Sequence, residues 1–227
     1  YDAFGTDKFD ALYKKYEKDS SVNKKTIPAQ DLFSDLLKER AETGRIYVMN
    51  LDHCNSHSSF KDKVSMSNLC QEITLPTTPI SSIDDSQGEI ALCILSAINV
   101  GQLNNLDDLE NLCELTVRAL EEIIEYQDYP VLAAELSTKS RRSLGIGYIG
   151  LAHYLAKQGH KYHDKGAWDS VDRLSEAFQF YLLKASNKIA QEKGACEGFK
   201  QTKYADGLLP IDHYKKDVDK IVPHKQR

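Results

Sequence analysis

Ile90-Ala91-Leu92-Cys93-Ile94-Leu95 is a continuous apolar run, which is typical of a strand buried on both faces, as in a parallel sheet. Residues 142–149 are also strand-like. Between these segments, residues 106–126 carry apolar side chains at helical spacing, with acidic residues early, as the helix dipole prefers. A strand, a helix and a second strand in this order predict an α/β fold.

Other segments extend this pattern in both directions. Helices are predicted over residues 7–18, 28–43, 151–157 and 168–191. Pro28 lies near the first turn of the second helix, and Gly44 and Gly194 follow the ends of the second and the last. Residues 45–51 are predicted to be a short strand, residues 52–67 a polar loop, and residues 68–75 an extended segment. Without a repeat or a low-complexity linker, the chain is predicted to be one domain.

Composition excludes several classes of protein. The chain has 227 residues, of which 41% are hydrophobic, enough for a globular core. Its formal charge of −5 comes from well-mixed acids and bases, which disfavours a nucleic-acid partner. No run approaches the ~18 apolar residues of a membrane helix, and no signal peptide is evident, so we expect a soluble cytoplasmic protein without a membrane partner.

The termini and the cysteines add two expectations. The chain begins with Tyr1 rather than Met and closes on His224-Lys225-Gln226-Arg227, so we expect a piece of a longer polypeptide. Its five cysteines are odd in number and form no Cys-x-x-Cys pair. Reduced thiols in a reducing compartment are therefore favoured over a disulfide scaffold.

Asn68-Leu69-Cys70-Gln71-Glu72 is the stretch richest in chemistry. In extended backbone, side chains at i, i+2 and i+4 share one face, so Asn68, Cys70 and Glu72 would point together. They would supply a hydrogen-bond donor, a reactive sulfur and a base. The alternative is that Cys70 is a small buried hydrophobe and that Asn68 and Glu72 mark a solvated strand edge.

Gly145-Ile146-Gly147-Tyr148-Ile149-Gly150 satisfies the Gly-x-Gly-x-x-Gly fingerprint of dinucleotide folds. The fingerprint needs a buried strand ahead, but residues 137–142 are polar and cationic. Asp169 is near the distance expected of the ribose-binding acid, yet at a helix start it is more simply a cap. Glycines that allow close approach of strand and helix are the alternative.

Two further groups of residues carry side chains that bind metals or transfer electrons. Asp52-His53-Cys54-Asn55-Ser56-His57 offers zinc-ligand types, but four ligands from six neighbouring residues would strain a tetrahedral site, so a polar loop and no metal are predicted. Cys93 within its apolar run is either an inert filler or, together with Cys70, one of two thiols for chemistry that consumes electrons in pairs.

The chain resembles the large, catalytic subunit of class I ribonucleotide reductase. The resemblance rests on motifs that occur in order over nearly the whole sequence: Thr43-Gly44-Arg45-Ile46-Tyr47, Asp52-His53-Cys54-Asn55, Ser67-Asn68-Leu69-Cys70-Gln71-Glu72-Ile73-Thr74-Leu75-Pro76, Gly88-Glu89-Ile90-Ala91-Leu92-Cys93, Leu95-Ser96-Ala97-Ile98-Asn99, Tyr126-Gln127-Asp128-Tyr129-Pro130, Arg141-Arg142-Ser143-Leu144-Gly145-Ile146-Gly147 and Tyr181-Leu182-Leu183-Lys184-Ala185-Ser186-Asn187.

This resemblance implies a fold and a set of roles. Residues 1–227 would form part of a ten-stranded α/β barrel, with Cys70 on a finger loop threaded through its centre. Cys70 would become a thiyl radical that takes the 3′ hydrogen of a ribonucleotide, Glu72 would accept the 3′-hydroxyl proton, and Asn68 would hydrogen-bond in the same site. Cys93 would be one of the two thiols that reduce C2′. Arg45 and Tyr47 would lie close to where the radical arrives.

The resemblance also implies partners. They are a ribonucleoside diphosphate substrate, the remaining segments of the large subunit, a metal-containing small subunit that generates the radical, and thioredoxin or glutaredoxin as reductant. No cofactor is expected in this chain itself. No second cysteine matches the partner of Cys93, nor is a phosphate-binding loop found, so we expect the chain alone to be inactive. The rival interpretations are a non-catalytic α/β assembly fragment and a dinucleotide-dependent oxidoreductase that uses Gly145 to Gly150.

Overall fold

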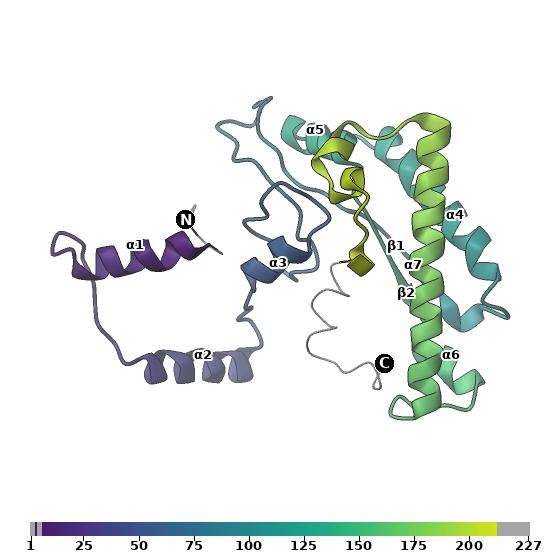
Figure 1. Ribbon diagram of the computed structural model, residues 1–227, viewed down its shortest axis with the longest axis horizontal. Coiled ribbons are helices and arrows are strands. Elements are labelled where there is room, and N and C mark those ends of the chain that lie inside the picture. Colours follow the sequence, from purple (N-terminus) through teal and green to yellow (C-terminus); the bar gives the residue numbers. More distant parts are fainter. Residues whose placement is uncertain (1–2, 4–5, 213–227) are drawn as a thin grey trace. The chain divides into compact units, whose positions relative to one another are not determined.

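The computed structural model describes residue 3 and residues 6–212 of the chain, which divides into two compact units (Figure 1). One unit comprises Tyr1–Thr77 together with Gln201–Arg227, and the other comprises Thr78–Lys200. Among the described residues, no helix combines the length and the apolar character that crossing a membrane requires.

The Thr78–Lys200 unit is built around two parallel strands. Strand β1 (Ile94–Asn99) pairs with β2 (Leu144–Ile149), and the register runs from Ile94 opposite Leu144 to Asn99 opposite Ile149. The crossover contains η1 (Val100–Gln102), α4 (Asp108–Tyr126) and α5 (Leu132–Arg141), and β2 is followed by α6 (Leu151–Lys157) and α7 (Lys165–Lys193). Helices α4, α6 and α7 confirm the predictions, whereas η1 and α5 were not predicted, and the α/β class is confirmed.

The core lies between the strands and the layer of α4 and α7, which run side by side (Figure 1). Leu109 of α4 and Leu174 of α7 are fully buried, and burial of one such side chain contributes about 2 kcal/mol. Every second strand residue faces this layer: Ile98, Ile146 and Tyr148 belong to the same apolar cluster. The helical spacing seen in the sequence therefore marks the core face of α4.

Charged side chains join α4 to α7 outside this core. Three of the ion pairs recur every four residues along both helices, and each of the three joins residues 74 positions apart: Lys184 with Glu110 at 2.5 Å, Lys188 with Glu114 at 2.7 Å, and Arg118 with Glu192 at 2.6 Å. The constant offset means that α4 and α7 run parallel, as expected for helices that each follow one of two parallel strands.

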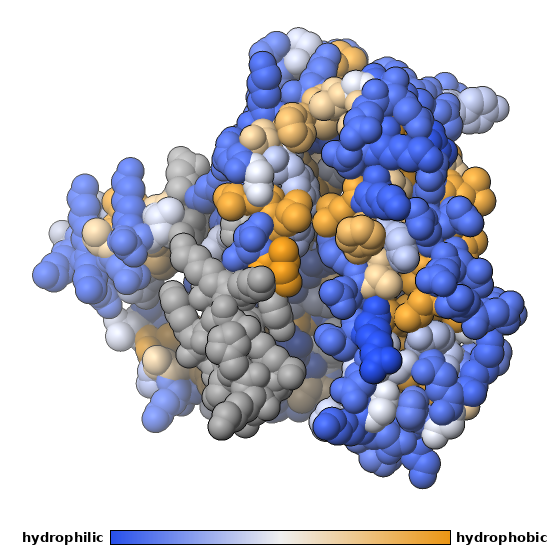
Figure 2. Space-filling model, turned by 45° about the vertical axis from the view of Figure 1, so that its right-hand side comes forward, coloured by the Kyte–Doolittle hydropathy of each residue, from blue (hydrophilic) through white to orange (hydrophobic). Residues whose placement is uncertain are grey.

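The opposite face of the strand pair is open to solvent within the described residues. Leu95 is 60% exposed, and Ala97, Asn99, Gly147 and Ile149 are exposed on the same face. The prediction of a strand buried on both faces is therefore wrong for the described residues. Apolar side chains reach the surface elsewhere too, and Figure 2 shows hydrophobic patches among the hydrophilic residues.

The first predicted strand is also displaced along the chain. It begins at Ile94 rather than Ile90, because the preceding backbone is paired with other segments. Glu89 forms an isolated antiparallel bridge with Thr78, and the Ile90 N–H donates to the Ala133 carbonyl at 3.1 Å. Pairing with the β2 side begins at Ile94, whose N–H donates to the Ser143 carbonyl at 3.3 Å.

The other unit contains α1 (Asp7–Lys18), α2 (Ala29–Thr43), α3 (Leu51–His57) and the short turn η3 (Lys203–Asp206). A further short turn, η2 (Glu197–Gln201), lies in the Thr78–Lys200 unit except for its last residue. Helices α1 and α2 confirm the predictions for residues 7–18 and 28–43. Gly44 ends α2 in the left-handed conformation with φ 65°, as a glycine C-cap does. The strand predicted over residues 45–51 is wrong, since this segment has no regular structure before α3 begins.

The loop predicted over residues 52–67 is partly wrong, because α3 occupies its first part. Asn55 explains how this helix is held. Its side chain donates to the Leu51 carbonyl at 2.8 Å and to the Val64 carbonyl at 2.9 Å, and it accepts from the Val64 N–H at 2.8 Å. Val64 is fully buried, so one amide fixes the backbone six residues before Cys70.

Candidate active site

The segment around Cys70 forms a tight turn and not the extended strand predicted. The Gln71 N–H donates to the Asn68 carbonyl at 3.2 Å, and Gln71 adopts a positive φ of 64°. The Asn68 side chain then accepts from the Ile73 N–H at 3.0 Å. Asparagine favours such turns because its side chain substitutes for backbone hydrogen-bonding partners.

This turn brings together two of the three residues that the sequence grouped. The Asn68 Nδ2 donates to the Glu72 Oε1 at 2.6 Å, across the base of the turn. Cys70 lies at the tip and is exposed, next to Leu69, which is 79% exposed. The shared extended face is therefore wrong as geometry, but the amide and the carboxylate are in contact beside an exposed thiol.

Cys93 lies in the other unit, directly before β1. It is half-buried, and it precedes Leu95 by two residues, which places it toward the open face of the strand pair. The segment that leads to it is held firmly. Arg141 donates from Nε and Nη2 to the two oxygens of Glu89 at 3.0 and 2.9 Å, with only a tenth of the arginine side chain exposed.

Arg45 and Tyr47 lie just after α2, in backbone without regular structure, and both are exposed. The Arg45 N–H donates to the Thr43 Oγ1 at 3.2 Å, which continues the end of the helix.

His53 and Cys54 lie in helix α3 and not in the polar loop that was predicted. His53 and His57 are one turn apart, and their ring centroids are 6.4 Å apart. Among the described residues, no group of three or more His, Cys, Asp or Glu side chains is arranged to hold a metal ion.

The glycine-rich segment is strand β2, so the fingerprint lacks its structural context. A dinucleotide site needs the glycines in the turn that follows a strand, whereas Gly145 and Gly147 lie within the strand itself. Gly150 is different. It adopts a positive φ of 79° at the start of α6, and a Cβ atom there would lie 2.4 Å from the Asn99 Oδ1. Because Gly150 has no side chain, the backbone there can pack closely against Asn99, as the alternative interpretation held.

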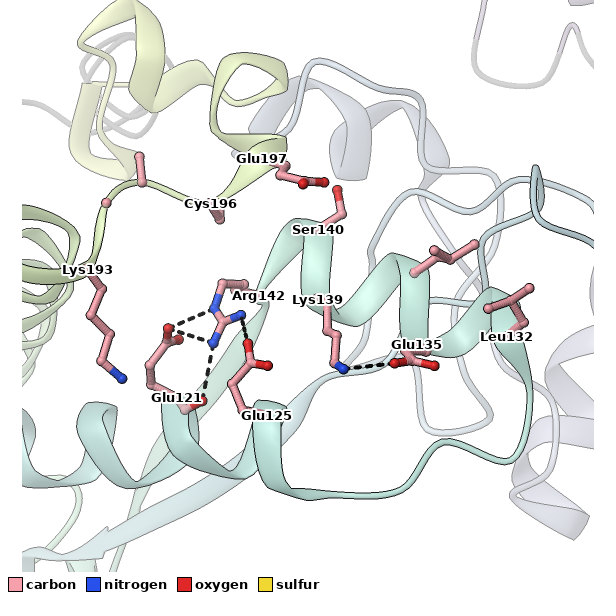
Figure 3. A pocket seen from close by; sticks show the side chains of 13 residues that line it. Glu121, Glu125, Leu132, Glu135, Lys139, Ser140, Arg142, Lys193, Cys196 and Glu197 are labelled. Atoms are coloured by element: carbon pink, nitrogen blue, oxygen red, sulfur yellow. Dashed lines mark hydrogen bonds and ion pairs between the residues drawn. The ribbon is translucent and has the colours of Figure 1, made fainter.

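A cavity of about 680 Å³ that the sequence did not predict lies among α4, α5 and the segment after α7 (Figure 3). Arg142 donates to Glu121 at 2.8 Å and to Glu125 at 2.5 Å, and these carboxylates neutralise it. Burial raises the pKa of the Cys196 thiol in the same cavity. Of the predicted site residues, none lines this cavity.

The thiol of Cys113 has a structural role. Cys113 of α4 is fully buried in the apolar core, and burial raises its pKa to about 11. A thiol in this environment is protonated and unreactive. The two cysteines singled out by the sequence, one exposed and one half-buried beside an open strand face, are more accessible than this one.

These features define a thiol-bearing α/β protein. Its parallel βα unit has an accessible thiol ahead of the first strand, and a second, exposed thiol lies beside a paired amide and carboxylate. The family model for the ribonucleotide reductase barrel domain matches residues 1–226, and the chain belongs to this family.

Relatives among well-described proteins agree with this assignment. The chain is 55% identical to the ribonucleoside-diphosphate reductase subunit alpha of Haemophilus influenzae and 54% identical to the subunit alpha of reductase 1 from Escherichia coli, in each case over 97% of this chain. It is 42% identical to the subunit alpha of Enterobacteria phage T4 over 96% of this chain. The chain spans about 30% of the length of these relatives.

Proposed function

We propose that the chain is part of the catalytic barrel of a ribonucleoside-diphosphate reductase α subunit, which converts ribonucleotides to 2′-deoxyribonucleotides by radical chemistry. The observation that supports this most directly is the hydrogen bond of Asn68 to Glu72 beside the exposed Cys70. An amide that holds a carboxylate next to an accessible sulfur is the arrangement that the reaction needs. The proposal includes the ten-stranded barrel with residues 68–72 on its central loop.

The first step assigns roles to the turn. The Cys70 thiyl radical takes the hydrogen atom from C3′ of the substrate, which breaks a C–H bond and forms an S–H bond. Glu72 accepts the proton of the 3′-hydroxyl as general base. Asn68 holds the carboxylate through its Nδ2 and so orients it toward that proton.

The reduction step assigns a role to Cys93. Cys93 and a second thiol, supplied from elsewhere in the protein, are oxidised together to a disulfide. Their two electrons and two protons reduce C2′ as its hydroxyl leaves as water. Thioredoxin or glutaredoxin then reduces the disulfide.

The radical comes from outside this chain. A small subunit that contains a metal generates it, and Arg45 and Tyr47 lie near the point where it arrives. Both residues are exposed in the described part of the chain, which supports this assignment. No cofactor is assigned to the chain itself.

Two substitutions in the full-length protein test these roles. Cys93→Ser is expected to retain hydrogen exchange at the substrate 3′ position and to lose multiple turnover, since hydrogen abstraction does not need this thiol. Cys70→Ser is expected to lose both, because an O–H bond is much stronger than an S–H bond. Normal turnover by Cys93→Ser, or 3′ exchange by Cys70→Ser, would reject the corresponding role.

A binding measurement separates the proposal from a non-catalytic assembly fragment. In the full-length protein, ribonucleoside diphosphate is expected to protect Cys70 from alkylation, because the substrate must lie against the sulfur. Cys196, in its separate cavity, serves as the unprotected control. Equal alkylation of Cys70 with and without nucleotide would favour the non-catalytic interpretation.

A further inference from the structure

Gly145 meets the Cys93 side chain across the strand pair. A Cβ atom placed on Gly145 would lie 2.8 Å from the Cys93 Sγ and 2.5 Å from the Leu95 Cδ2. Both distances are too short for a real contact. Gly145 is opposite Leu95 in the sheet, and Cys93 precedes Leu95 by two residues, so the thiol and the leucine lie over the same glycine from the same face.

Backbone conformation does not explain the glycine. Gly145 and Gly147 both lie in β2, and neither has the positive φ that favours glycine. A Cβ atom on Gly147 would have no neighbour within 4 Å, which contrasts with Gly145. Two glycines of one strand, two residues apart, therefore differ in what a methyl group would meet.

The two neighbours of Gly145 differ in how easily they can move. Leu95 is 60% exposed, so its side chain can rotate into solvent at little cost. The sulfur of Cys93 has one side-chain torsion, and it is half-buried behind backbone held by the Glu89–Arg141 pair. A methyl group at position 145 would therefore displace the thiol.

We propose that Gly145 is a positioning residue for Cys93. Because Gly145 has no side chain, it leaves the space through which the Cys93 thiol reaches the open face of the strand pair. This inference rests on the proposed function in that it takes Cys93 as a reducing thiol. It gives the first glycine of the Gly-x-Gly-x-x-Gly segment a role unrelated to dinucleotides. Gly147 has no such role.

The test compares Gly145→Ala with Gly147→Ala in the full-length protein. Gly145→Ala is expected to lower kcat by about 10²-fold, which is the loss that a displacement of about 1 Å at a reacting group produces. KM and 3′ hydrogen exchange are expected to stay within about twofold of wild type, because substrate binding and abstraction do not use Cys93. Gly147→Ala is expected to behave as wild type.

A second variant identifies which neighbour carries the effect. Leu95→Ala combined with Gly145→Ala removes the contact with the leucine and leaves the contact with the sulfur. The double variant is expected to remain as slow as Gly145→Ala. Restoration of kcat by Leu95→Ala would overturn the inference, since the leucine would then be the group displaced.

Alkylation of Cys93 tests the position of its thiol independently of the proposed function. The rate at which iodoacetamide modifies Cys93, followed by peptide mass spectrometry, is expected to fall about fivefold or more in Gly145→Ala, because the methyl group shields the sulfur. Gly147→Ala should leave it unchanged. If Gly145→Ala alkylates at the wild-type rate or faster, the inference is wrong even if Cys93 reduces substrate. If alkylation slows while Cys93→Ser turns over normally, the positioning holds and the reducing role fails.

Discussion

A single residue, Asn68, organises the turn that presents Cys70. Its carbonyl accepts from Gln71, its side-chain oxygen accepts from Ile73, and its side-chain nitrogen donates to Glu72. These three hydrogen bonds compensate for the positive φ of Gln71, a conformation that costs a non-glycine residue about 1 kcal/mol or more. The turn geometry and the orientation of the carboxylate therefore depend on the same side chain.

Glu72→Gln in the full-length protein is the sharpest residue-scale test. Glutamine keeps an oxygen that can accept from Asn68 but cannot act as a base. We expect turnover to fall by about 10²- to 10⁴-fold, with substrate affinity changed much less. Steady-state kinetics and a binding titration measure the two effects, and a thermal melt controls for damage to the fold. Normal turnover by this variant would show that Glu72 is only a polar surface residue.

At this scale the sequence identified the reactive types but not their geometry. Cys70, Glu72 and Asn68 were singled out from spacing in an assumed extended backbone, whereas the Asn68–Glu72 contact arises from a turn. The signal for the turn was present in asparagine itself, which favours such positions. The displaced start of β1 could not be predicted, because Ile90 pairs with a distant residue, Ala133.

At the scale of elements, the segment before β1 is fixed by one ion pair between a bridge and a helix. Glu89 forms the bridge with Thr78, and Arg141 ends α5. Hydrogen bonds from Arg141 hold the pKa of the Glu89 carboxyl below its ordinary value of 4.5, against the opposing effect of burial. The pair thereby joins two residues that are 52 positions apart in the sequence, and one of them, Glu89, precedes Cys93 by four residues.

Glu89→Gln is expected to destabilise the protein by about 1–3 kcal/mol at pH 7, since it breaks a bidentate pair and leaves a largely buried guanidinium. Because the folded-state pKa is lowered, the contribution is present above pH 4.5 and is lost as the pH falls below it. The difference from wild type should therefore shrink in acid. Denaturant unfolding measures it, with Glu122→Gln, whose carboxylate pairs with Lys193 on the surface, as control. Equal effects of the two variants would contradict this account.

Arg118→Met tests the ion pairs between α4 and α7. Arg118 bridges Glu114 and Glu192, but the groups are about one-third exposed or more, so the effect should be small. We expect the melting temperature to fall by at most about 4 °C in low salt and by less in 1 M NaCl, where screening is strong. Arg173→Met on the exposed side of α7 provides the matched control. A decrease that is as large in high salt would mean that lost packing, and not charge, is responsible.

Most helices and the strand over residues 142–149 were predicted well, and the other strands poorly, for a physical reason. The apolar stripe of α4 and the glycine after α7 are local signals, and both elements match the prediction closely. The strand predicted over residues 45–51 was a short, mostly apolar run with no partner that a sequence could reveal. Helix α5 was missed because residues 137–142 are polar, although Ser137 and Thr138 are buried against neighbouring elements.

At the scale of the whole molecule, paired carboxylates predict acid sensitivity. The pKa values of several acids are held below their ordinary values of 4.5 for Glu and 3.8 for Asp, chiefly by hydrogen bonds: Glu89, Glu114, Glu125 and Glu192, and Asp85, at about 2. A lowered folded-state pKa stabilises the fold above the ordinary value, and that stability is lost as the pH falls through the folded value.

We therefore expect the melting temperature to be level from pH 7 to about pH 5 and to fall steadily at lower pH. Thermal unfolding followed by circular dichroism in buffers of constant ionic strength measures this. A decrease that is complete before pH 5 would point to histidine titration instead. A level curve down to pH 3 would mean that these carboxylates contribute nothing to stability.

The constant spacing of three ion pairs between α4 and α7 also restricts sliding of one helix along the other. A slip of one turn in one direction would place Glu114 opposite Glu192, and a slip in the other direction would place Arg118 opposite Lys188. Either slip brings like charges together, although apolar side chains could interlock again after one turn. These charges are too exposed to stabilise the helix pair much. They nevertheless favour the observed alignment of α4 along α7 over a slip of one turn in either direction.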